Sequence, residues 1–412
     1  MFDKRFKSHH DAEAQYQSFL PSKRSSLEQL STFLNMGIDD YKRSCIYVHI
    51  PYCDKICSFC NLNRQKKDDT LEIYTQDLIK QIEWMGEHKY FDNHPIEALY
   101  FGGGTPTILS ASQMKRVLQA LQHSFQYADD IEISVETTLH NLSDKHLELF
   151  DEMGVNRISI GIQTFQSEGR KFFHRSLQKE QVVGKMKDLR QRFHGVISID
   201  KIYNYPGENE AMLLDDVRLI AKLGIDSVSF YSLMIHQGSK LSQSIKEEML
   251  NTTSDKSFHD LFIKEMSKYG YEVLELTKMA KIERDNYRYM EIRNQDGNTI
   301  PLGNGAGGQI AHFKMYAMDF KRIMVVENIG KDYEIANKIY GLFQYPLVNC
   351  QQLAKYGLQK DGVYSKAIEN LLKKGYLFEK DENLQMSETG LFYGNNIGGL
   401  LTKEFLENPN RD

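Results

Sequence analysis

The chain has few cysteines, little net charge and no long apolar run, and each shortage excludes a class of protein. Five cysteines in 412 residues are an odd number and too few for a secreted disulfide framework. A formal net charge of −5 gives neither the basic excess of a nucleic-acid-binding protein nor an acidic disordered tail. No apolar run reaches the roughly 20 residues that span a bilayer, and the polar first residues contain no signal segment. We therefore expect a cytoplasmic protein with no membrane span and no nucleic-acid partner.

Short β-branched runs alternate with longer helical segments through the middle of the chain. The predicted strands are 45–50, 97–102, 130–136, 156–161, 196–203 and 226–232. The predicted helices are 70–88, 111–126, 143–153, 179–192 and 211–223, with Ser112 and Ser143 at N-cap positions. This alternation predicts a parallel sheet with right-handed crossovers, and six strands are too few for a closed eight-stranded barrel. The expected fold is therefore α/β, a partial (β/α)6 barrel whose open side could admit a large substrate.

The pattern changes at both ends of this region and predicts four segments. We expect an N-terminal helical arm over 1–43, the partial barrel over 44–280, a glycine-rich connecting region with polar loops over 281–332, and a C-terminal domain over 333–412. The last segment reads as helix, strand, turn, strand and helix, which resembles a winged-helix-like α+β domain. Its charges are mixed rather than arranged in a basic stripe, and this disfavours DNA as its ligand.

Three cysteines follow the first predicted strand with the spacing Cys53-x3-Cys57-x2-Cys60. Thiolates on a tight loop can hold a cuboidal 4Fe–4S cluster. Three of them leave one iron free to bind the amino and carboxylate groups of S-adenosylmethionine (SAM). The alternatives are a zinc site, with His49 as a possible fourth ligand, or buried cysteines with no ligand. The remaining two cysteines are expected to be small buried hydrophobic residues.

The run IYVHIPYCDKICSFC at 46–60 resembles the radical SAM superfamily, in the group built around oxygen-independent coproporphyrinogen III oxidase. That group includes haem chaperones, radical methyltransferases and anaerobic haem-utilisation enzymes. The resemblance extends from residue 44 to 310, and more weakly to the C-terminus. It implies that the cluster cleaves SAM to a 5′-deoxyadenosyl radical, with electrons from a small donor such as flavodoxin or ferredoxin. It also implies a tetrapyrrole substrate and a C-terminal domain that covers the substrate site.

The resemblance assigns further residues, which lie at or near the carboxyl ends of successive predicted strands, where barrel sites form. The residues matched to SAM binding are Gly102, Gly103, Gly104, Thr105, Glu136, Gln163, Arg175 and Asp200. Tyr47 matches a tyrosine near the cluster and is the predicted catalytic residue. Gly104, Thr105 and Gln163 also match contacts to a second SAM, so two SAM molecules are expected. Taken singly, each charged residue could instead form a structural ion pair, and the glycines a tight turn.

Two departures narrow the expected reaction. Position 62 is Leu, where coproporphyrinogen oxidases carry a further cysteine, and Asn61 and Leu62 replace the Asp-Phe pair of haem chaperones. The loop at 285–309 resembles the haem-utilisation branch, whose enzymes methylate haem and open its ring without oxygen. The tyrosines of that loop could line a porphyrin pocket or could be core residues. We expect haem methylation and ring opening, with coproporphyrinogen oxidation, methylation of another aromatic compound, and haem chaperoning as alternatives.

Overall fold

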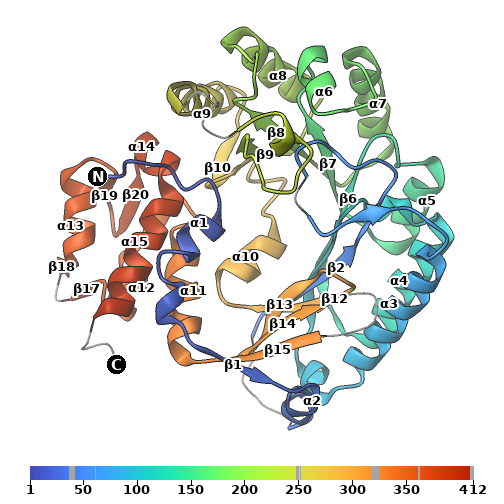
Figure 1. Ribbon diagram of the computed structural model, residues 1–412, viewed down its shortest axis with the longest axis horizontal. Helices are drawn as coiled ribbons and strands as arrows, with labels where there is room; N and C mark the ends of the chain where they lie inside the picture. The colour runs from blue at the N-terminus through green and yellow to red at the C-terminus, as the bar shows by residue number, and fades with distance from the viewer. Residues whose placement is uncertain are drawn as a thin grey trace.

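The computed structural model describes residues 1–36, 42–60, 62–246, 250, 252–317, 324–360 and 362–408. Within these residues, a curved sheet of 13 strands forms the larger body, and helices cover its outer face (Figure 1). From edge to edge the strands are β1 (Ser22–Ser25), β15 (Met324–Ile329), β14 (Phe313–Ala317), β13 (Gly307–Ile310), β12 (Asn298–Leu302), β2 (Ser44–Ile50), β5 (Ile96–Gly103), β6 (Tyr127–Thr137), β7 (Arg157–Gln163), β8 (Val196–Tyr203), β9 (Ser227–Ser232), β11 (Lys278–Ala280) and β10 (Glu272–Glu275). Strands β12 to β9 run parallel, and the strands beyond them on both sides are antiparallel.

The six predicted strands are confirmed as β2, β5, β6, β7, β8 and β9, which follow one another across the sheet in chain order. Apart from the first half of β6, their side chains are buried on both faces almost throughout, as is typical of a parallel sheet covered by helices. The helices of this region are α3 (Leu71–Gly86), α4 (Ala111–Ser124), α5 (Asp144–Met153), α6 (Ser167–Phe172), α7 (Lys179–Arg192), α8 (Glu210–Lys222) and α9 (Thr252–Ser267). The predicted α/β class is therefore confirmed. No helix in the described ranges is both long and apolar enough to cross a bilayer.

Helix starts follow local capping chemistry. Ser143 caps α5 as predicted, because its hydroxyl accepts a hydrogen bond from the backbone N–H of His146. The prediction of Ser112 as the cap of α4 is wrong, because the cap is Ser110. The Ser110 hydroxyl accepts from the Gln113 N–H, and the Gln113 side chain accepts from the Ser110 N–H, so the pair forms a capping box.

The glycine-rich region after residue 280 continues the sheet. Strands β12, β13, β14 and β15 and the helix α10 (Arg288–Asn294) lie in it, joined by loops, so the region carries regular structure that the sequence did not indicate. Gly307 and Gly308 hid β13 by interrupting the alternation of side chains that marks a strand. At Gly308 a Cβ would lie 2.1 Å from the Thr299 carbonyl oxygen, so glycine permits the close approach of β13 to β12. The predicted domain boundaries stay predictions.

The C-terminal residues form a smaller body with its own hydrophobic core (Figure 1). Strands β16, β20 and β19 make a three-stranded antiparallel sheet, and the turn before β20 places Asp381 at φ 53°. The elements are α11 (Lys331–Leu342), β16 (Leu347–Asn349), α12 (Cys350–Lys355), β17 (Gln359–Lys360), β18 (Val363–Tyr364), α13 (Lys366–Lys373), β19 (Leu377–Lys380), β20 (Asn383–Met386), α14 (Glu388–Phe392) and α15 (Gly394–Glu407). This order contains the predicted helix, strand, turn, strand and helix.

The N-terminal arm joins the two bodies. It contains the short helices α1 (His9–Glu13) and α2 (Leu27–Leu34), and β1 between them pairs with β15; residues 37–41 lie outside the described ranges. Tyr16 packs into the C-terminal core. The Arg5 guanidinium donates to Tyr203 at the end of β8 (2.9 Å) and to Asp255 on α9 (3.0 Å), and its Nε donates to the Phe392 carbonyl (2.9 Å). The arm therefore fixes the C-terminal body against the barrel.

Candidate active site

One pocket of about 200 Å³ collects most of the residues that the sequence singles out. The predicted site residues that line it are Cys53, Cys57, Cys60, Gly103, Gly104, Thr105, Glu136, Gln163, Arg175 and Asp200. They come from the loop after β2, which carries the three cysteines, and from β5, β6, β7 and β8 and the loops that follow them, because parallel strands place their carboxyl ends along one edge of the sheet. Residues scattered over about 150 positions therefore meet in one cavity.

Two predicted site residues, Gly102 and Tyr47, are not among the residues that line this pocket. A Cβ on Gly102 would lie 3.0 Å from the Tyr47 ring and 3.1 Å from Glu136 Oε2, so both residues pack directly behind the wall. The Tyr47 ring stacks on Tyr100 and Tyr289, with centroids 6.3 and 6.2 Å away. The structure therefore gives Tyr47 a place in an aromatic cluster, and its catalytic role stays a prediction.

The cysteine loop is closed at its base and braced along its length. Cys53 ends β3 (Tyr52–Cys53), which pairs with β4 (Gln65–Lys66) on the far side of the loop. The Arg64 guanidinium donates to the carbonyl oxygens of Cys60 (2.6 Å) and Leu62 (2.7 Å). Burial raises the pKa of the Cys53 thiol to about 11 and also raises the pKa of Cys60. Iron binding must therefore displace protons from these thiols.

The zinc alternative finds little support in this geometry. Among the described residues, no three His, Cys, Asp or Glu side chains converge closely enough to hold one metal ion. His49 does not complete a set, because its Nδ1 lies 3.0 Å from the Tyr47 hydroxyl and its Nε2 lies 2.9 Å from the Asn63 carbonyl oxygen. A structural zinc ion needs four donors around one point. Thiolates that each bind a different iron of a cuboidal cluster need no common point, so the three cysteines fit a cluster better.

The glycines after β5 lie against the strand that leads to the cysteines. Gly103 has φ +106°, and a Cβ there would lie 2.7 Å from His49 Nε2. At Gly104 a Cβ would lie 2.5 Å from the Tyr52 carbonyl oxygen, and the Gly104 N–H donates to Ile50 O (2.8 Å). Only glycine allows this approach. The turn therefore presents backbone, rather than side chains, to the pocket.

Two carboxylates contribute most of the negative charge in the predicted set. Glu136 accepts a hydrogen bond from the Tyr100 hydroxyl (2.7 Å). Burial, together with repulsion from Asp200, raises the pKa of Glu136 to about 7. Burial also raises the pKa of Asp200, although Lys278 and Arg175 favour its charged form. Both carboxylates line the pocket, where they can accept further hydrogen bonds from the hydroxyl groups of a ligand.

Among the residues predicted to bind SAM, two buried polar atoms have no hydrogen-bond partner within the described part of the chain. They provide a test of whether SAM fits the pocket. They are Oε1 of Gln163, a residue at φ 62°, and Nε of Arg175. A buried polar atom without a hydrogen bond costs about 1–3 kcal/mol, so such atoms indicate a missing ligand. The methionine part of SAM offers an ammonium group for a carbonyl oxygen and a carboxylate for a guanidinium. The residues present therefore fit SAM.

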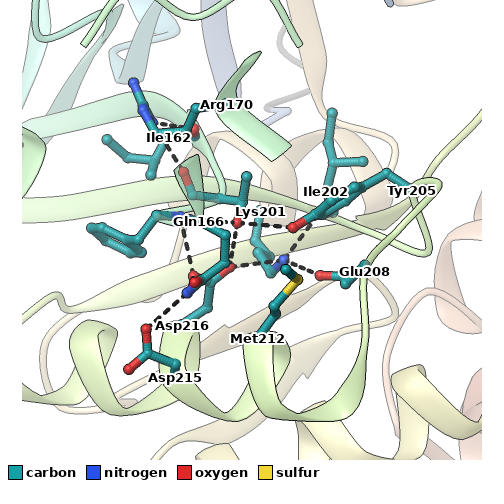
Figure 2. A network of polar contacts seen from close by, with 12 residues as sticks. Ile162, Gln166, Arg170, Lys201, Ile202, Tyr205, Glu208, Met212, Asp215 and Asp216 are labelled. Carbon is teal, nitrogen blue, oxygen red and sulfur yellow. Dashed lines mark hydrogen bonds and ion pairs between the residues drawn. The ribbon is translucent and has the colours of Figure 1, made fainter. Parts of the chain in front are cut away.

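A buried polar network holds the loop that carries Gln163 and Arg175 (Figure 2). Lys201 on β8 lies 2.7 Å from Glu208 and 3.0 Å from Asp216, and all three side chains are at most 2% exposed. Asp216 in turn accepts from the Thr164 hydroxyl and from the Phe165 N–H, just after Gln163. On the other side of the loop, Arg170 donates to the carbonyl oxygens of Ile162, Thr164 and Leu177. The network therefore fixes the start of this loop against β8 and α8, and Arg170 joins that start to Leu177, just beyond Arg175.

Sequence reasoning missed part of the pocket wall and the layer behind it. The unanticipated wall residues include Lys55, Arg64, His140, Asn141, Ser159 and His174. For His140, Asn141 and His174 the position in the loops after β6 and β7 was the available signal, since loops at the carboxyl ends of barrel strands build the site. Lys55 and Arg64 lie on the cysteine loop, and Ser159 lies within β7. The tyrosines of the 285–309 loop pack into an aromatic cluster. Tyr287 precedes α10, Tyr289 lies on it, and both rings pack against Tyr100. Helix α10 lies inside the curve of the sheet (Figure 1).

Comparison with known proteins adds to this geometry. Residues 47–220 match the model of the Radical SAM superfamily. The chain is 28% identical to an anaerobilin synthase of Escherichia coli over 300 residues, 72% of this chain and 67% of that protein. It is 26% identical to a heme chaperone HemW of Lactococcus lactis over 376 residues, 86% of this chain and 96% of that protein. The solved structure of Escherichia coli coproporphyrinogen III oxidase (HemN) has the same fold, with a TM-score of 0.76, 19% identity, and 91% of this chain and 93% of that chain covered.

Fold, cysteine spacing and domain match together define a radical SAM enzyme, with a 4Fe–4S cluster and SAM as its cofactors. Within that class the chain is similar to the coproporphyrinogen III oxidases, the HemW heme chaperones and the anaerobilin synthases.

Proposed function

We propose that this enzyme acts on a tetrapyrrole, and that its reaction is the methylation of haem followed by oxygen-independent opening of the ring. The similarity to an anaerobilin synthase supports this, as does the resemblance of the 285–309 loop to the haem-utilisation branch. The similarities to heme chaperones and to a coproporphyrinogen oxidase support the broader tetrapyrrole class.

The observation that carries the choice of reaction is Leu62. Coproporphyrinogen oxidases have a further cysteine at this position, whereas here an exposed leucine lines the pocket two residues after Cys60. An apolar side chain suits the face of a large flat aromatic ring and adds no thiol to the wall. Lys55 and Arg64 line the same pocket and can pair with the carboxylates of a tetrapyrrole. This wall supports binding of an intact macrocycle without a second thiol beside the cluster.

Each predicted residue has a role in this proposal. Cys53, Cys57 and Cys60 bind three irons of the cluster. The main chain from Gly102 to Thr105 binds the amino group of SAM, and Arg175 binds its carboxylate. When bound, cluster and SAM together supply a 5′-deoxyadenosyl radical by one-electron cleavage of a carbon–sulfur bond.

The remaining predicted residues contact the ribose of SAM or a second SAM, or act beside the pocket. Glu136 accepts from the ribose hydroxyls and Asp200 lies beside it. Gly104, Thr105 and Gln163 contact a second SAM, the methyl donor. Tyr47, which stacks on Tyr100 and Tyr289 behind the pocket wall, is the proposed catalytic residue. The electron comes from a small donor such as flavodoxin or ferredoxin, and the C-terminal body covers the substrate.

Heme chaperoning is the second candidate, because the similarity to the Lactococcus lactis chaperone spans 96% of that protein. Product analysis separates the candidates. Anaerobically reconstituted enzyme is incubated with SAM, a reductant, and either haem or coproporphyrinogen III, and the products are identified by mass spectrometry. The proposed reaction consumes haem and yields both S-adenosylhomocysteine and 5′-deoxyadenosine. Intact haem after full SAM cleavage would favour the chaperone, and carbon dioxide release from coproporphyrinogen III would favour the oxidase.

A further inference from the structure

Two histidines that have no assigned role line the same pocket as the cluster cysteines. His140 lies on the loop after β6, and His174 lies between α6 and α7. Both are exposed at the pocket, and among the described residues neither imidazole has a hydrogen-bond or ion-pair partner. Most buried histidines of this chain bond through their rings, as His49, His88, His94 and His146 do. The two imidazoles at the pocket are therefore free to bind something that enters it.

The backbone of His174 has an unfavourable conformation, which supports a functional role for this residue. His174 has φ +57°, in the left-handed region, where a residue other than glycine costs about 1–2 kcal/mol. Its N–H donates to the Lys171 carbonyl oxygen (3.1 Å) and closes the end of α6, a task that glycine or asparagine performs with less strain. Closing the helix therefore does not explain an imidazole here. Strained positions of this kind cluster at functional sites.

The loop that carries His174 is held firmly. The Arg175 N–H donates to the Arg170 carbonyl oxygen (2.8 Å), and the Arg170 guanidinium donates to Leu177 O (2.5 Å) and Ile162 O (3.1 Å). Phe173, on the other side of His174, is fully buried. The imidazole is thus presented to the pocket from a fixed backbone, as a metal ligand requires.

The chemistry of the wall indicates what this imidazole binds. A histidine nitrogen is a common protein ligand for haem iron. The same pocket also holds Lys55 and Arg64, whose charges suit the propionates of haem, and the apolar Leu62. A metal-free tetrapyrrole has carboxylates and an apolar face but gives an imidazole no iron to bind. An imidazole that binds the iron would therefore favour haem over a metal-free substrate.

We propose that His174 is an axial ligand to the iron of a haem bound at the mouth of this pocket. The inference rests on the proposed function, because it takes haem as the ligand of this pocket. It adds the residue that would select haem over a metal-free tetrapyrrole. His140, in the same pocket, is the competing imidazole, and the test separates the two.

The test compares His174→Ala and His140→Ala with His123→Ala, an exposed histidine on α4 that is absent from the pocket lining. Full-length, cluster-loaded protein is titrated with ferric haem, followed by difference absorption and by electron paramagnetic resonance of the haem iron. Metal-free protoporphyrin IX is titrated in parallel by fluorescence quenching. We expect His174→Ala to weaken haem binding about tenfold or more and to change the spin state of the iron. Added imidazole should restore the wild-type spectrum, protoporphyrin binding should stay unchanged, and the other two variants should resemble wild type.

Several results would overturn the proposal. One is an unchanged haem spectrum in His174→Ala. Others are loss of ligation in His140→Ala alone, or equal weakening of haem and protoporphyrin IX in His174→Ala. The outcome is separable from that of the proposed function. If haem binds through His174 but is never consumed, the ligand assignment stands and the proposed reaction is refuted. If haem is consumed but its spectrum is unchanged in His174→Ala, the reaction stands and the ligand assignment is refuted.

Discussion

Replacement of Lys201 by Met tests whether the buried network behind the pocket holds the Gln163–Arg175 loop. The Lys201 ammonium lies 2.7 Å from Glu208 and 3.0 Å from Asp216, and the two carboxylates are fully buried (Figure 2). Lys201 also donates to the Ile202 carbonyl oxygen (3.0 Å). Met has a similar length and apolar stem, so the substitution removes the charge and leaves little cavity. The two carboxylates then repel each other with no cation between them.

The expected loss is large and depends on pH. Removal of one partner of a buried ion pair costs about 3–5 kcal/mol, because the remaining charge is buried and uncompensated. Burial already raises the pKa of Glu208, and loss of Lys201 removes the group that opposes this shift. A raised folded-state pKa gives stability that is present at low pH and lost as pH rises through it. The variant should therefore be destabilised by about 3–5 kcal/mol at pH 8 and by less at pH 5.

Urea denaturation followed by circular dichroism, at pH 5 and pH 8, measures this loss, and equilibrium binding of SAM measures the effect on the site. Lys222→Met, on the exposed last turn of α8, is the matched control and should change stability by no more than about 0.5 kcal/mol. Because Asp216 of the network holds Thr164 and Phe165, directly after Gln163, SAM affinity should fall in Lys201→Met and stay unchanged in the control. A loss under about 1 kcal/mol at pH 8, or an equal loss at both pH values, would refute the reasoning.

Three further predictions concern the pocket itself. Cys57→Ala should keep the circular dichroism of wild type but lose the brown colour of the reconstituted cluster, because two thiolates remain for a site that needs three. Gly103→Ala should abolish SAM binding, because the new Cβ would lie 2.7 Å from His49 Nε2. The control is Gly207→Ala, which is also at positive φ but has open space around it and should cost only about 1–2 kcal/mol of stability. The pKa of Glu136 is raised to about 7 in the folded protein, so its contribution to stability is present at low pH and is lost as pH rises through that value, a change of about 3 kcal/mol. Glu136→Gln should therefore flatten the pH dependence of the stability of the cofactor-free protein between pH 5 and pH 8.

Local patterns in the sequence determined the six central strands and the helices between them. Buried parallel strands are continuous apolar runs, and this signal needs no knowledge of the partner strand. The cysteine spacing likewise specified a single loop, and the structure places Cys53, Cys57 and Cys60 in one pocket. Even the wrong N-cap of α4 was a local error of two positions, from Ser110 to Ser112, between two serines of similar capping tendency.

Tertiary structure alone decided which distant residues meet. The Arg157–Asp285 ion pair, the contact of Arg5 with Asp255, and the bonds of Lys201 to two carboxylates join positions whose charges look like ordinary surface charges in the sequence. The same holds for His140 and His174, which enter the pocket only because β6 and β7 end side by side. The physical reason is that periodicity and capping act over a few residues, whereas burial and pairing of polar groups depend on which strands become neighbours.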